Sequence, residues 1–405
     1  MRTHTCNELN ESNIGQTVTI CGWVNAYRGH GTGLVFVDVR DKTGVTQVVF
    51  DSDGGNDALM EAGNRLRNED CIKIVGTVRE RASKNDRIAT GSIEVLVSEL
   101  EVLSKTKKLP FIPSTEKDLP NEEVRLRYRY IDLRRPTMQN ILRTRHRVAK
   151  LTRDYFDEHD FIEVETPVLC RSTPEGARDF LVPSRNQPGM WYALPQSPQL
   201  FKQILMVGGC DRYLQIVKCF RDEDPRADRQ AEFTQIDLEM SFVDRDEVLD
   251  IMEGFAKKIW KEMLGVELAE FPRMTYREAM DRYGIDRPDT RFDLELVDIS
   301  ALAPKPGFGV FEEALLKPKG VVKAIRVPGA AEKFSRKVTD KFNPFAQQFG
   351  AGGVPTVKYV GGEFTTGIAK FLGDIKHELV ERLGLERGDA VVFGADTYSI
   401  VTKAL

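Results

Sequence analysis

The sequence predicts a multidomain α+β protein, and three observations carry this prediction. The chain has 405 residues, and single domains rarely exceed about 250–300 residues. Its composition, with 41% hydrophobic and 30% charged residues, is that of an ordinary globular protein rather than a fibrous, disordered or membrane chain. The sequence pattern changes twice: closely spaced strands come first, helices and strand pairs follow, and a part rich in Gly and Pro comes last.

Residues 1–105 predict a five-stranded β-barrel of the OB-fold type. Five segments are rich in β-branched and aromatic residues and are separated by turn signals: Val18–Val24, Leu34–Arg40, Val45–Phe50, Cys71–Val78 and Ile93–Leu103. A helix-like stretch, Asp57–Arg67, lies between the third and the fourth, as expected of an OB-fold. Such barrels often bind single-stranded nucleic acid. A small barrel with another purpose remains an open alternative at this point.

Residues 106–137 predict a linker or hinge, because Pro110, Pro113 and Pro120 interrupt a segment of mixed charge. From Asn121 to Arg153 there are ten Lys and Arg residues against three acidic residues, although the whole chain has a net charge of −4. Such a basic stretch suits a phosphate-bearing partner. A solvated helix face explains it equally well.

Residues 138–290 predict a domain built on helices and a strand pair. Apolar residues recur at helical spacing from about Asn140 to His159, and a strand follows over Phe161–Pro167. The strands Arg212–Phe220 and Gln235–Phe242 flank a polar loop, and a helix is predicted over Asp246–Met263. In residues 291–405 short strands and helices alternate between clusters of Gly and Pro, which predicts a separate α/β domain.

Several classes of protein are excluded. No run of about 18 apolar residues occurs, so we expect no transmembrane helix and no membrane partner. The first residues lack the apolar core of a secretory signal. The six cysteines are scattered without a CxxC pair, which indicates reduced thiols, no metal site and a cytoplasmic protein.

Three polar clusters are candidates for chemistry. The segment 221–233 carries arginines and acids between two apolar strands, as a polyanion site would. The second cluster spans 174–180. The third spans 195–202, where a helix start would place Gln199 and Lys202 within one turn. A self-neutralised loop and ordinary helix-start chemistry are the plain alternatives.

Taken together, these clusters resemble the bacterial type of aspartyl-tRNA synthetase, in the aspartyl/asparaginyl/lysyl subclass of class II. Thr173-Pro174-Glu175-Gly176-Ala177-Arg178-Asp179 and Gln196-Ser197-Pro198-Gln199-Leu200-Phe201-Lys202-Gln203 look specific for the aspartyl member. The segment ending at Pro167 resembles motif 1, and Phe220–Glu223 with Phe233–Asp237 resembles motif 2. Residues 291–405, which contain Gly394-Ala395-Asp396, resemble the GAD insertion domain. The resemblance covers the whole chain.

The resemblance implies domains and roles. Residues 1–105 would be the anticodon-binding domain, 106–137 the hinge, 138–290 the class II catalytic domain with an antiparallel sheet (incomplete here), and 291–405 the GAD-like domain. Arg221 and Glu223 would be catalytic. L-aspartate would be held by Glu175, Gln199, Lys202, Arg221, Gln235 and Asp237. ATP would be held by Arg221, Asp222, Glu223, Gln230 and Phe233. Phe36, Gln47 and Glu94 would read the anticodon, although Phe36 and Phe233 could equally be packing residues. His30 would mark enzymes that charge tRNA(Asn) as well as tRNA(Asp).

The implied function is aspartate–tRNA ligase, with ATP as a substrate together with Mg²⁺ and no tightly bound cofactor. The implied assembly is a homodimer through residues 140–167. The family's motif 3, which ends in an arginine, does not occur up to Leu405. We therefore expect a truncated or fragmentary form with impaired activity of its own. The alternative is a non-catalytic tRNA-binding relative that uses the barrel. An asparaginyl or lysyl enzyme is a weaker third possibility.

Overall fold

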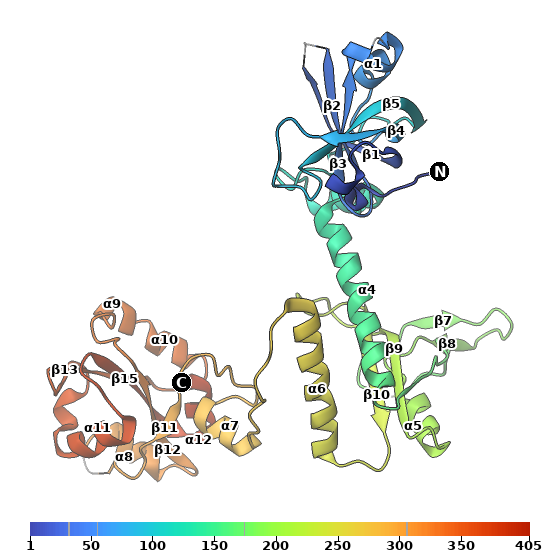
Figure 1. Ribbon diagram of the computed structural model, residues 1–405. Coiled ribbons are helices and arrows are strands. Elements are labelled where there is room, and N and C mark those ends of the chain that lie inside the picture. The colour runs from blue at the N-terminus through green and yellow to red at the C-terminus, as the bar shows by residue number, and fades with distance from the viewer. Residues whose placement is uncertain (31–32, 55, 174, 305–306) are drawn as a thin grey trace. The chain divides into compact units, whose positions relative to one another are not determined.

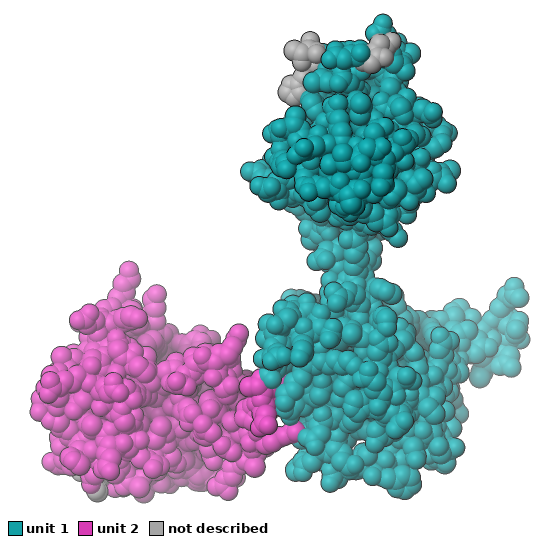
Figure 2. Space-filling model, in the orientation of Figure 1, with its two compact units in different colours: residues 1–268 teal, residues 269–405 magenta. Residues whose placement is uncertain are grey.

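The computed structural model describes residues 1–30, 33–54, 56–173, 175–304 and 307–405. The chain forms two compact units, Met1–Leu268 and Ala269–Leu405 (Figure 2). In the described part of the chain, no helix is both long and apolar enough to cross a membrane.

The first unit begins with a closed five-stranded barrel, which confirms the OB-fold prediction (Figure 1). Its strands follow the order β1-β2-β3-β5-β4, and their bounds are Thr17–His30 (β1), Leu34–Arg40 (β2), Val45–Asp51 (β3), Cys71–Glu80 (β4) and Ile93–Ser104 (β5). The helix α1, Asp57–Asn64, lies between β3 and β4 as predicted. The strands β3 and β5 pair in parallel and close the barrel.

Alternation along β2 explains why this segment folds as a barrel strand. Val35, Val37 and Val39 are at most 2% exposed and belong to the barrel core. Burying a valine side chain stabilises the fold by about 1.5–3 kcal/mol. Phe36 and Asp38 alternate with these valines and therefore point to the outer face, because successive side chains of a strand point to opposite sides.

Buried acids fasten the linker to the barrel. Glu69 accepts hydrogen bonds at 2.8 Å from both Arg40 of the barrel and Arg134 of the linker. The fully buried Asp132 pairs with Arg129 and, at 2.9 Å, with Arg135. Two short helices, α2 (Glu122–Arg127) and α3 (Arg129–Asp132), lie in this segment. The proline-rich linker therefore makes defined contacts with the barrel.

The rest of the first unit is a sheet with helices on both faces. The sheet order is β10-β9-β6, with bounds Glu232–Met240 (β10), Arg212–Phe220 (β9) and Ile162–Glu163 (β6). Its helices are α4 (Pro136–Asp157), α5 (Gln199–Val207) and α6 (Arg245–Leu264), and a hairpin joins β7 (Leu181–Pro183) to β8 (Trp191–Ala193). Leu214 and Leu238 of the sheet pack with Phe156 of α4 and Phe255 of α6. The helices α4 and α6 therefore cover one face, and α5 packs on the strands β9 and β10 from the other.

Two predicted strands differ from the observed ones. The strand predicted over Phe161–Pro167 contains only Ile162–Glu163 in regular pairing, with one further bond from the Val164 N–H to the Leu214 carbonyl at 3.0 Å. The strand predicted to begin at Gln235 begins at Glu232 instead, because Glu232 and Phe233 already pair with Phe220 and Cys219.

The second unit is a five-stranded sheet with flanking helices. Its order is β11-β12-β15-β13-β14, and all neighbouring pairs are antiparallel. The strands are Leu296–Asp298 (β11), Gly320–Val327 (β12), Thr356–Val360 (β13), Glu363–Thr365 (β14) and Asp389–Thr397 (β15). The helices are Tyr276–Tyr283 (α7), Gly309–Leu316 (α8), Arg336–Thr339 (α9), Phe342–Gln347 (α10), Lys376–Leu383 (α11) and Tyr398–Ala404 (α12). Strands and helices alternate along this part of the chain, as the sequence pattern predicts.

The second unit begins at Ala269, whereas the sequence pattern places the change at residue 291. The reason is α7, which belongs to this unit. The Tyr398 hydroxyl donates to Asp281 Oδ1 at 2.7 Å, and the buried Lys323 ammonium donates to the Asp281 carbonyl at 2.6 Å.

The Gly394-Ala395-Asp396 segment has a structural role in β15. A Cβ at Gly394 would lie 2.9 Å from Leu405, so glycine allows the C-terminal residues to pack closely on the strand. Asp396 pairs with Lys317 of the α8 turn at 2.7 Å.

Candidate active site

The polar face of the β9–β10 sheet is the best candidate for an active site. Residues 234 and 236 of β10 line the side toward α4, so Gln235, Asp237 and Glu239 point toward α5, because side chains alternate. Two of the residues predicted to bind aspartate, Gln235 and Asp237, therefore lie on the face of β10 toward α5. A third, Lys202, reaches this face from α5. The sequence segments 195–202 and 233–237, far apart in the chain, thus meet at one surface.

Lys202 lies between two carboxylates. Its ammonium donates to Asp237 Oδ1 at 2.9 Å and lies 3.2 Å from Glu239 Oε2. The lysine is only 8% exposed. Burial acts to lower the pKa of Lys202, but the hydrogen bonds and charges of Asp237 and Glu239 outweigh it and raise the pKa above its ordinary value. The ammonium is therefore charged at neutral pH.

Asp237 has one carboxylate oxygen to spare. Its Oδ2 is buried and accepts no hydrogen bond from the described residues, although the Tyr213 hydroxyl lies close to this carboxylate. Burial raises the pKa of Tyr213, and the nearby charge of Asp237 raises that pKa further. Buried polar atoms are normally satisfied, and an unsatisfied one calls for a specific explanation. A cationic donor, such as an ammonium group of a ligand, would satisfy this oxygen.

The environment of Cys219 shows which charged residues gather here. Burial raises the pKa of the Cys219 thiol to about 11, while Arg221 and Lys202 act to lower it and Asp237 and Glu175 act to raise it. The thiol donates to Gln235 Oε1 at 3.1 Å. These four charged residues, all predicted to bind substrate, thus lie close enough to the thiol to influence it. The structure brings them together.

The loop that carries Glu175 is held by the segment before α5. The Ser197 hydroxyl donates to Glu175 Oε2 at 2.8 Å. The Gln196 amide, 2% exposed, donates to the Ala177 carbonyl at 2.9 Å and accepts from the Ala177 N–H at 3.0 Å. It also contacts Asp179. A cavity of about 240 Å³ opens beside these residues and is lined by Glu175 and Ser197.

The motif at 221–233 places an aromatic ring next to cations. The Arg221 guanidinium lies 5.1 Å from the centre of the Phe233 ring. Glu223 pairs with Arg229 at 3.2 Å, and the Asp222 N–H donates to the Arg178 carbonyl at 3.0 Å. Arg221, Asp222 and Glu223 are half-buried.

Two other predicted site residues are less engaged. Gln230 is exposed. Gln199 is the first residue of α5, one helical turn before Lys202, so the two side chains share a helix face.

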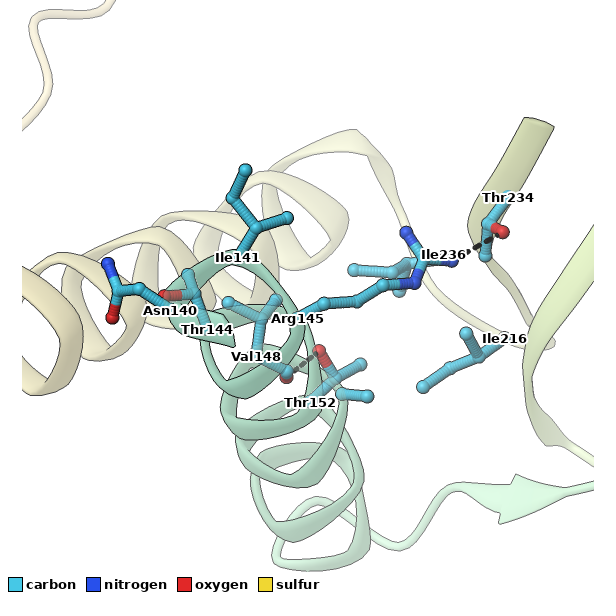
Figure 3. A pocket seen from close by; sticks show the side chains of 10 residues that line it. Asn140, Ile141, Thr144, Arg145, Val148, Thr152, Ile216, Thr234 and Ile236 are labelled. Carbon is cyan, nitrogen blue, oxygen red and sulfur yellow. Dashed lines mark hydrogen bonds between the residues drawn. The ribbon is translucent and has the colours of Figure 1, made fainter. Parts of the chain in front are cut away.

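A cavity of about 610 Å³ lies on the other face of the sheet (Figure 3). It is lined mainly by apolar and threonine side chains of α4, β9 and β10, and Arg145 crosses it to donate to the Thr234 hydroxyl at 2.7 Å. Catalytic chemistry needs convergent charged or polar groups. The sheet face toward α5 carries such charged and polar groups, although the cavity beside it is smaller. We therefore place the candidate active site on the face toward α5.

On the barrel, two predicted anticodon-reading residues touch directly. The Gln47 amide donates to Glu94 Oε2 at 2.8 Å, and both side chains are 3% exposed. Arg28 donates to Gln47 at 3.1 Å, and Arg79 donates to Glu94 at 2.8 Å. Phe36 is half-buried. It lies on the same outer face as Gln47, because Asp38, two residues further along β2, pairs with Gln47 across the strands.

Not every expectation can be placed. The side chain of His30, proposed to mark tRNA choice, lies outside the described part of the structure, as do residues 31–32. Among the described residues, no group of three or more His, Cys, Asp or Glu side chains could hold a metal ion by itself.

Glu239 is not predicted from the sequence, and Gln196 and Ser197 are predicted only as members of the segment 195–202, without a role of their own. Glu239 could have been found from its spacing, because it lies two residues after Asp237 on the same strand and hence on the same face. No local signal distinguishes Gln196 from Gln199.

Comparisons with known proteins agree with this arrangement. Residues 121–379 match the family of class II tRNA synthetases (D, K and N), and residues 18–103 match the OB-fold nucleic acid binding domain. The protein named aspartate–tRNA ligase from Macrococcus caseolyticus (strain JCSC5402) is 50% identical over 408 residues, covering 100% of this chain and 68% of that protein. The aspartate–tRNA ligase from Halalkalibacterium halodurans is 48% identical, with the same coverage.

Solved structures show the same fold. The asparaginyl-tRNA synthetase from Pyrococcus horikoshii, complexed with asparaginyl-adenylate, aligns with a TM-score of 0.58 and 24% identity, covering 65% of this chain and 58% of that one. The family matches and the two relatives at about 50% identity establish the family. The chain belongs to the class II tRNA synthetases (D, K and N), a family of aminoacyl-tRNA ligases, and within it to the aspartate–tRNA ligases.

Proposed function

We propose that the β9–β10 face binds L-aspartate and that the substrate's ammonium reaches the spare oxygen of Asp237. The observation that carries the proposal is the Lys202–Asp237–Glu239 group with its unpaired Asp237 Oδ2. Lys202 offers a positive charge for the side-chain carboxylate of aspartate. Glu175 and Asp237 offer negative charge for its ammonium. Asparagine, which lacks that carboxylate, would gain less from the cation.

ATP, taken up as its magnesium complex, would bind beside the aspartate. Adenine would stack on Phe233, and Arg221 would contact both the aspartate carboxylate and the α-phosphate. Arg221 already lies over Phe233, which supports a shared site for base and phosphate. Asp222, Glu223 and Gln230 would contribute further contacts to the nucleotide.

The reaction would be attack of an α-carboxylate oxygen of aspartate on the α-phosphorus of ATP. The bond to the bridging oxygen breaks, pyrophosphate leaves, and the mixed anhydride aspartyl-adenylate forms. A hydroxyl of the 3′-terminal ribose of tRNA(Asp) then attacks the carbonyl carbon of the adenylate. An ester bond forms, the anhydride C–O bond breaks, and AMP and the hydroxyl proton leave. Arg221 would neutralise charge on the phosphoryl group, and the remaining residues would hold the reactants in line.

The barrel would bind the anticodon loop through Phe36, Gln47 and Glu94. Single-stranded bases are recognised by stacking on aromatic rings and by hydrogen bonds to their edges. The contact between Gln47 and Glu94 supports this, because it places an amide and a carboxylate side by side near Phe36. Charging of tRNA(Asn) as a second substrate belongs to the same proposal.

The decisive test is amino-acid-dependent ATP–pyrophosphate exchange by the purified chain, with aspartate, asparagine and lysine in parallel. Exchange with aspartate alone supports the proposal. Exchange with asparagine or lysine instead overturns the substrate assignment. A folded chain that shows no exchange but binds tRNA(Asp) would favour the non-catalytic tRNA-binding alternative.

A further inference from the structure

A basic cavity in the second unit has no role in the proposed reaction. It measures about 320 Å³ and lies between α9, β13 and the turn after β14. Arg336 and Lys358 line it from two different elements, and Thr339, Thr356 and Thr366 add hydroxyl groups. The apolar ring of Phe334 forms part of its wall. Two cations and several hydroxyls around a small space match the chemistry of a phosphate group.

The cations in and around this cavity are poorly neutralised within the protein. Lys358 has no ion pair among the described residues, and Arg336 reaches only Asp340, at 3.8 Å, with 95% of its side chain exposed. Such a long, exposed pair contributes little to stability. The charge therefore remains available to an anionic partner.

More cations lie beyond the cavity, in α9 and in the residues on either side of it. Lys333, Lys337 and Lys341 are exposed and, like Lys358, make no ion pair with the described residues. The acids in this stretch are Glu332 and Asp340. The segment 332–341 together with Lys358 therefore carries five positive charges against two negative ones. A positively charged surface formed by five such side chains can contact more than one phosphate group, as in a nucleic-acid backbone.

The turn beside the cavity has an unusual backbone. Thr366 has a φ of +65°, which β-branched residues rarely adopt. Next to it, a Cβ at Gly367 would lie 1.9 Å from the Thr356 carbonyl. Strained residues of this kind persist where the surrounding structure holds them, often at binding sites. The Thr356 hydroxyl, on the cavity wall, has no partner among the described residues and can donate to a ligand.

We propose that this surface, defined by Lys333, Arg336, Lys337, Lys341 and Lys358, binds the sugar–phosphate backbone of tRNA. The inference rests on the proposed function, which supplies tRNA as the partner. The cavity would hold one phosphate, and Lys333, Lys337 and Lys341, in and around α9, would contact the phosphates next to it. These groups contact phosphates and not base edges, so the binding is independent of tRNA identity.

The test measures binding of the full chain to tRNA(Asp) and to an unrelated tRNA over a range of salt concentrations. The variant is Arg336→Glu with Lys358→Glu. The control is Lys319→Glu, because Lys319 is also exposed and without an ion pair among the described residues. Lys319 precedes Gly320, which pairs with Thr397, whereas Lys358 pairs with Ala390. The two lysines thus lie about 23 Å apart along β15.

We expect the double variant to bind both tRNAs at least about tenfold more weakly, with the slope of log affinity against log salt reduced by about two. Lys319→Glu should bind like the original chain. Lys337→Glu with Lys341→Glu provides a second variant outside the cavity, and it should also lower the slope for both tRNAs. Circular dichroism melting checks that all variants are folded.

Unchanged affinity and slope in both double variants, with normal binding by the original chain, would overturn the inference and leave the proposed function intact. Failure of the original chain to bind any tRNA would instead overturn the proposed function. Calorimetry with inorganic phosphate and AMP separates a free-phosphate site from an RNA surface. Binding of inorganic phosphate that the variants abolish, with tRNA affinity unchanged, would contradict the RNA assignment.

Discussion

Lys202, which we propose as a ligand of aspartate, also contributes to the stability of the fold. It is buried between Asp237 and Glu239, so its removal leaves two carboxylates close together without their cation. Like charges in a poorly solvated site repel strongly, and breaking a buried ion pair typically costs about 3–5 kcal/mol. In the proposed function, a substrate carboxylate binds the same ammonium.

Lys202→Met is therefore expected to lower the free energy of unfolding by about 3 kcal/mol at neutral pH and to abolish aspartate binding measured by calorimetry. The raised pKa of Lys202 fixes the sign of the pH dependence. Its contribution is complete below the ordinary lysine pKa and is lost as pH rises through the higher folded-state pKa. The difference in unfolding free energy between the original chain and the variant should therefore shrink only in alkaline solution.

The matched control is Lys218→Met on the same sheet, because Lys218 forms an exposed pair with Glu232. Exposed pairs contribute at most about 1 kcal/mol. Equal losses of stability in the two variants would show that the environment of Lys202 has no special importance.

Gln196 is expected to position the Glu175 loop rather than to touch the substrate. Gln196→Leu removes both hydrogen bonds to Ala177, each worth about 0.5–1.5 kcal/mol. The dissociation constant for aspartate should rise about tenfold, with a change of less than threefold in the affinity for ATP. Gln187→Leu, in the exposed β7–β8 turn, is the control. An equal weakening of ATP binding would argue for a general loss of structure.

At the scale of elements, four polar side chains on the outer face of the barrel form a hydrogen-bonded network. Arg28, Gln47, Glu94 and Arg79 are linked in sequence by hydrogen bonds of 2.8–3.1 Å. The two central members are nearly inaccessible, and the arginines at the ends are more exposed. A nucleotide base that binds Gln47 must therefore replace at least one of the hydrogen bonds that Gln47 makes to Arg28 and Glu94.

Gln47→Leu should lower barrel stability by about 1–3 kcal/mol, because Glu94 loses a buried donor. It should also reduce the preference for tRNA(Asp) over a tRNA with an altered anticodon, measured by gel shift. Lys73→Ala, which breaks the exposed pair with Glu101, controls for general effects on the barrel. Preserved discrimination with reduced stability would assign Gln47 a purely structural role.

Strands in the barrel could be predicted because they alternate in polarity, as Val35, Val37 and Val39 show. The extent of the strand before Pro167 could not be predicted, because only Ile162 and Glu163 pair with β9, whereas the strand-like sequence continues to Pro167. Pairing with β9 alone sets its length. Likewise, the residues of the candidate site could be proposed from motifs, but their grouping around Cys219 depends on contacts between segments far apart in the chain.

At the scale of the whole molecule, tertiary contacts decide where the second unit begins. Asp281 is joined to Lys323 and Tyr398, partners that lie more than 40 residues away. No change in composition marks α7, so the sequence pattern places the boundary later. The first unit also exposes several large apolar residues, which a partner could cover in solution.

The segment 140–167, which we propose as the homodimer interface, carries several of these residues. Ile141, Leu142 and Ile162 are 51%, 49% and 56% exposed, and Ile141 also lines the cavity between α4 and the sheet. Exposed apolar patches commonly mark interfaces between proteins. A second copy of the same surface could bury them in a symmetric contact.

Ile141→Glu with Leu142→Glu is therefore expected to convert a dimer into a monomer of 45.8 kDa, measured by light scattering coupled to size-exclusion chromatography. Charges placed in an apolar interface lose hydration without gaining partners, which penalises association strongly. Leu316→Glu is the control, because Leu316 is 86% exposed on the second unit and should leave the dimer unchanged. A double variant that remains dimeric, or an original chain that is monomeric at micromolar concentration, would contradict this interface. Because neither substitution touches the β9–β10 site, aspartate binding in the monomer would further show whether the site is complete within one chain.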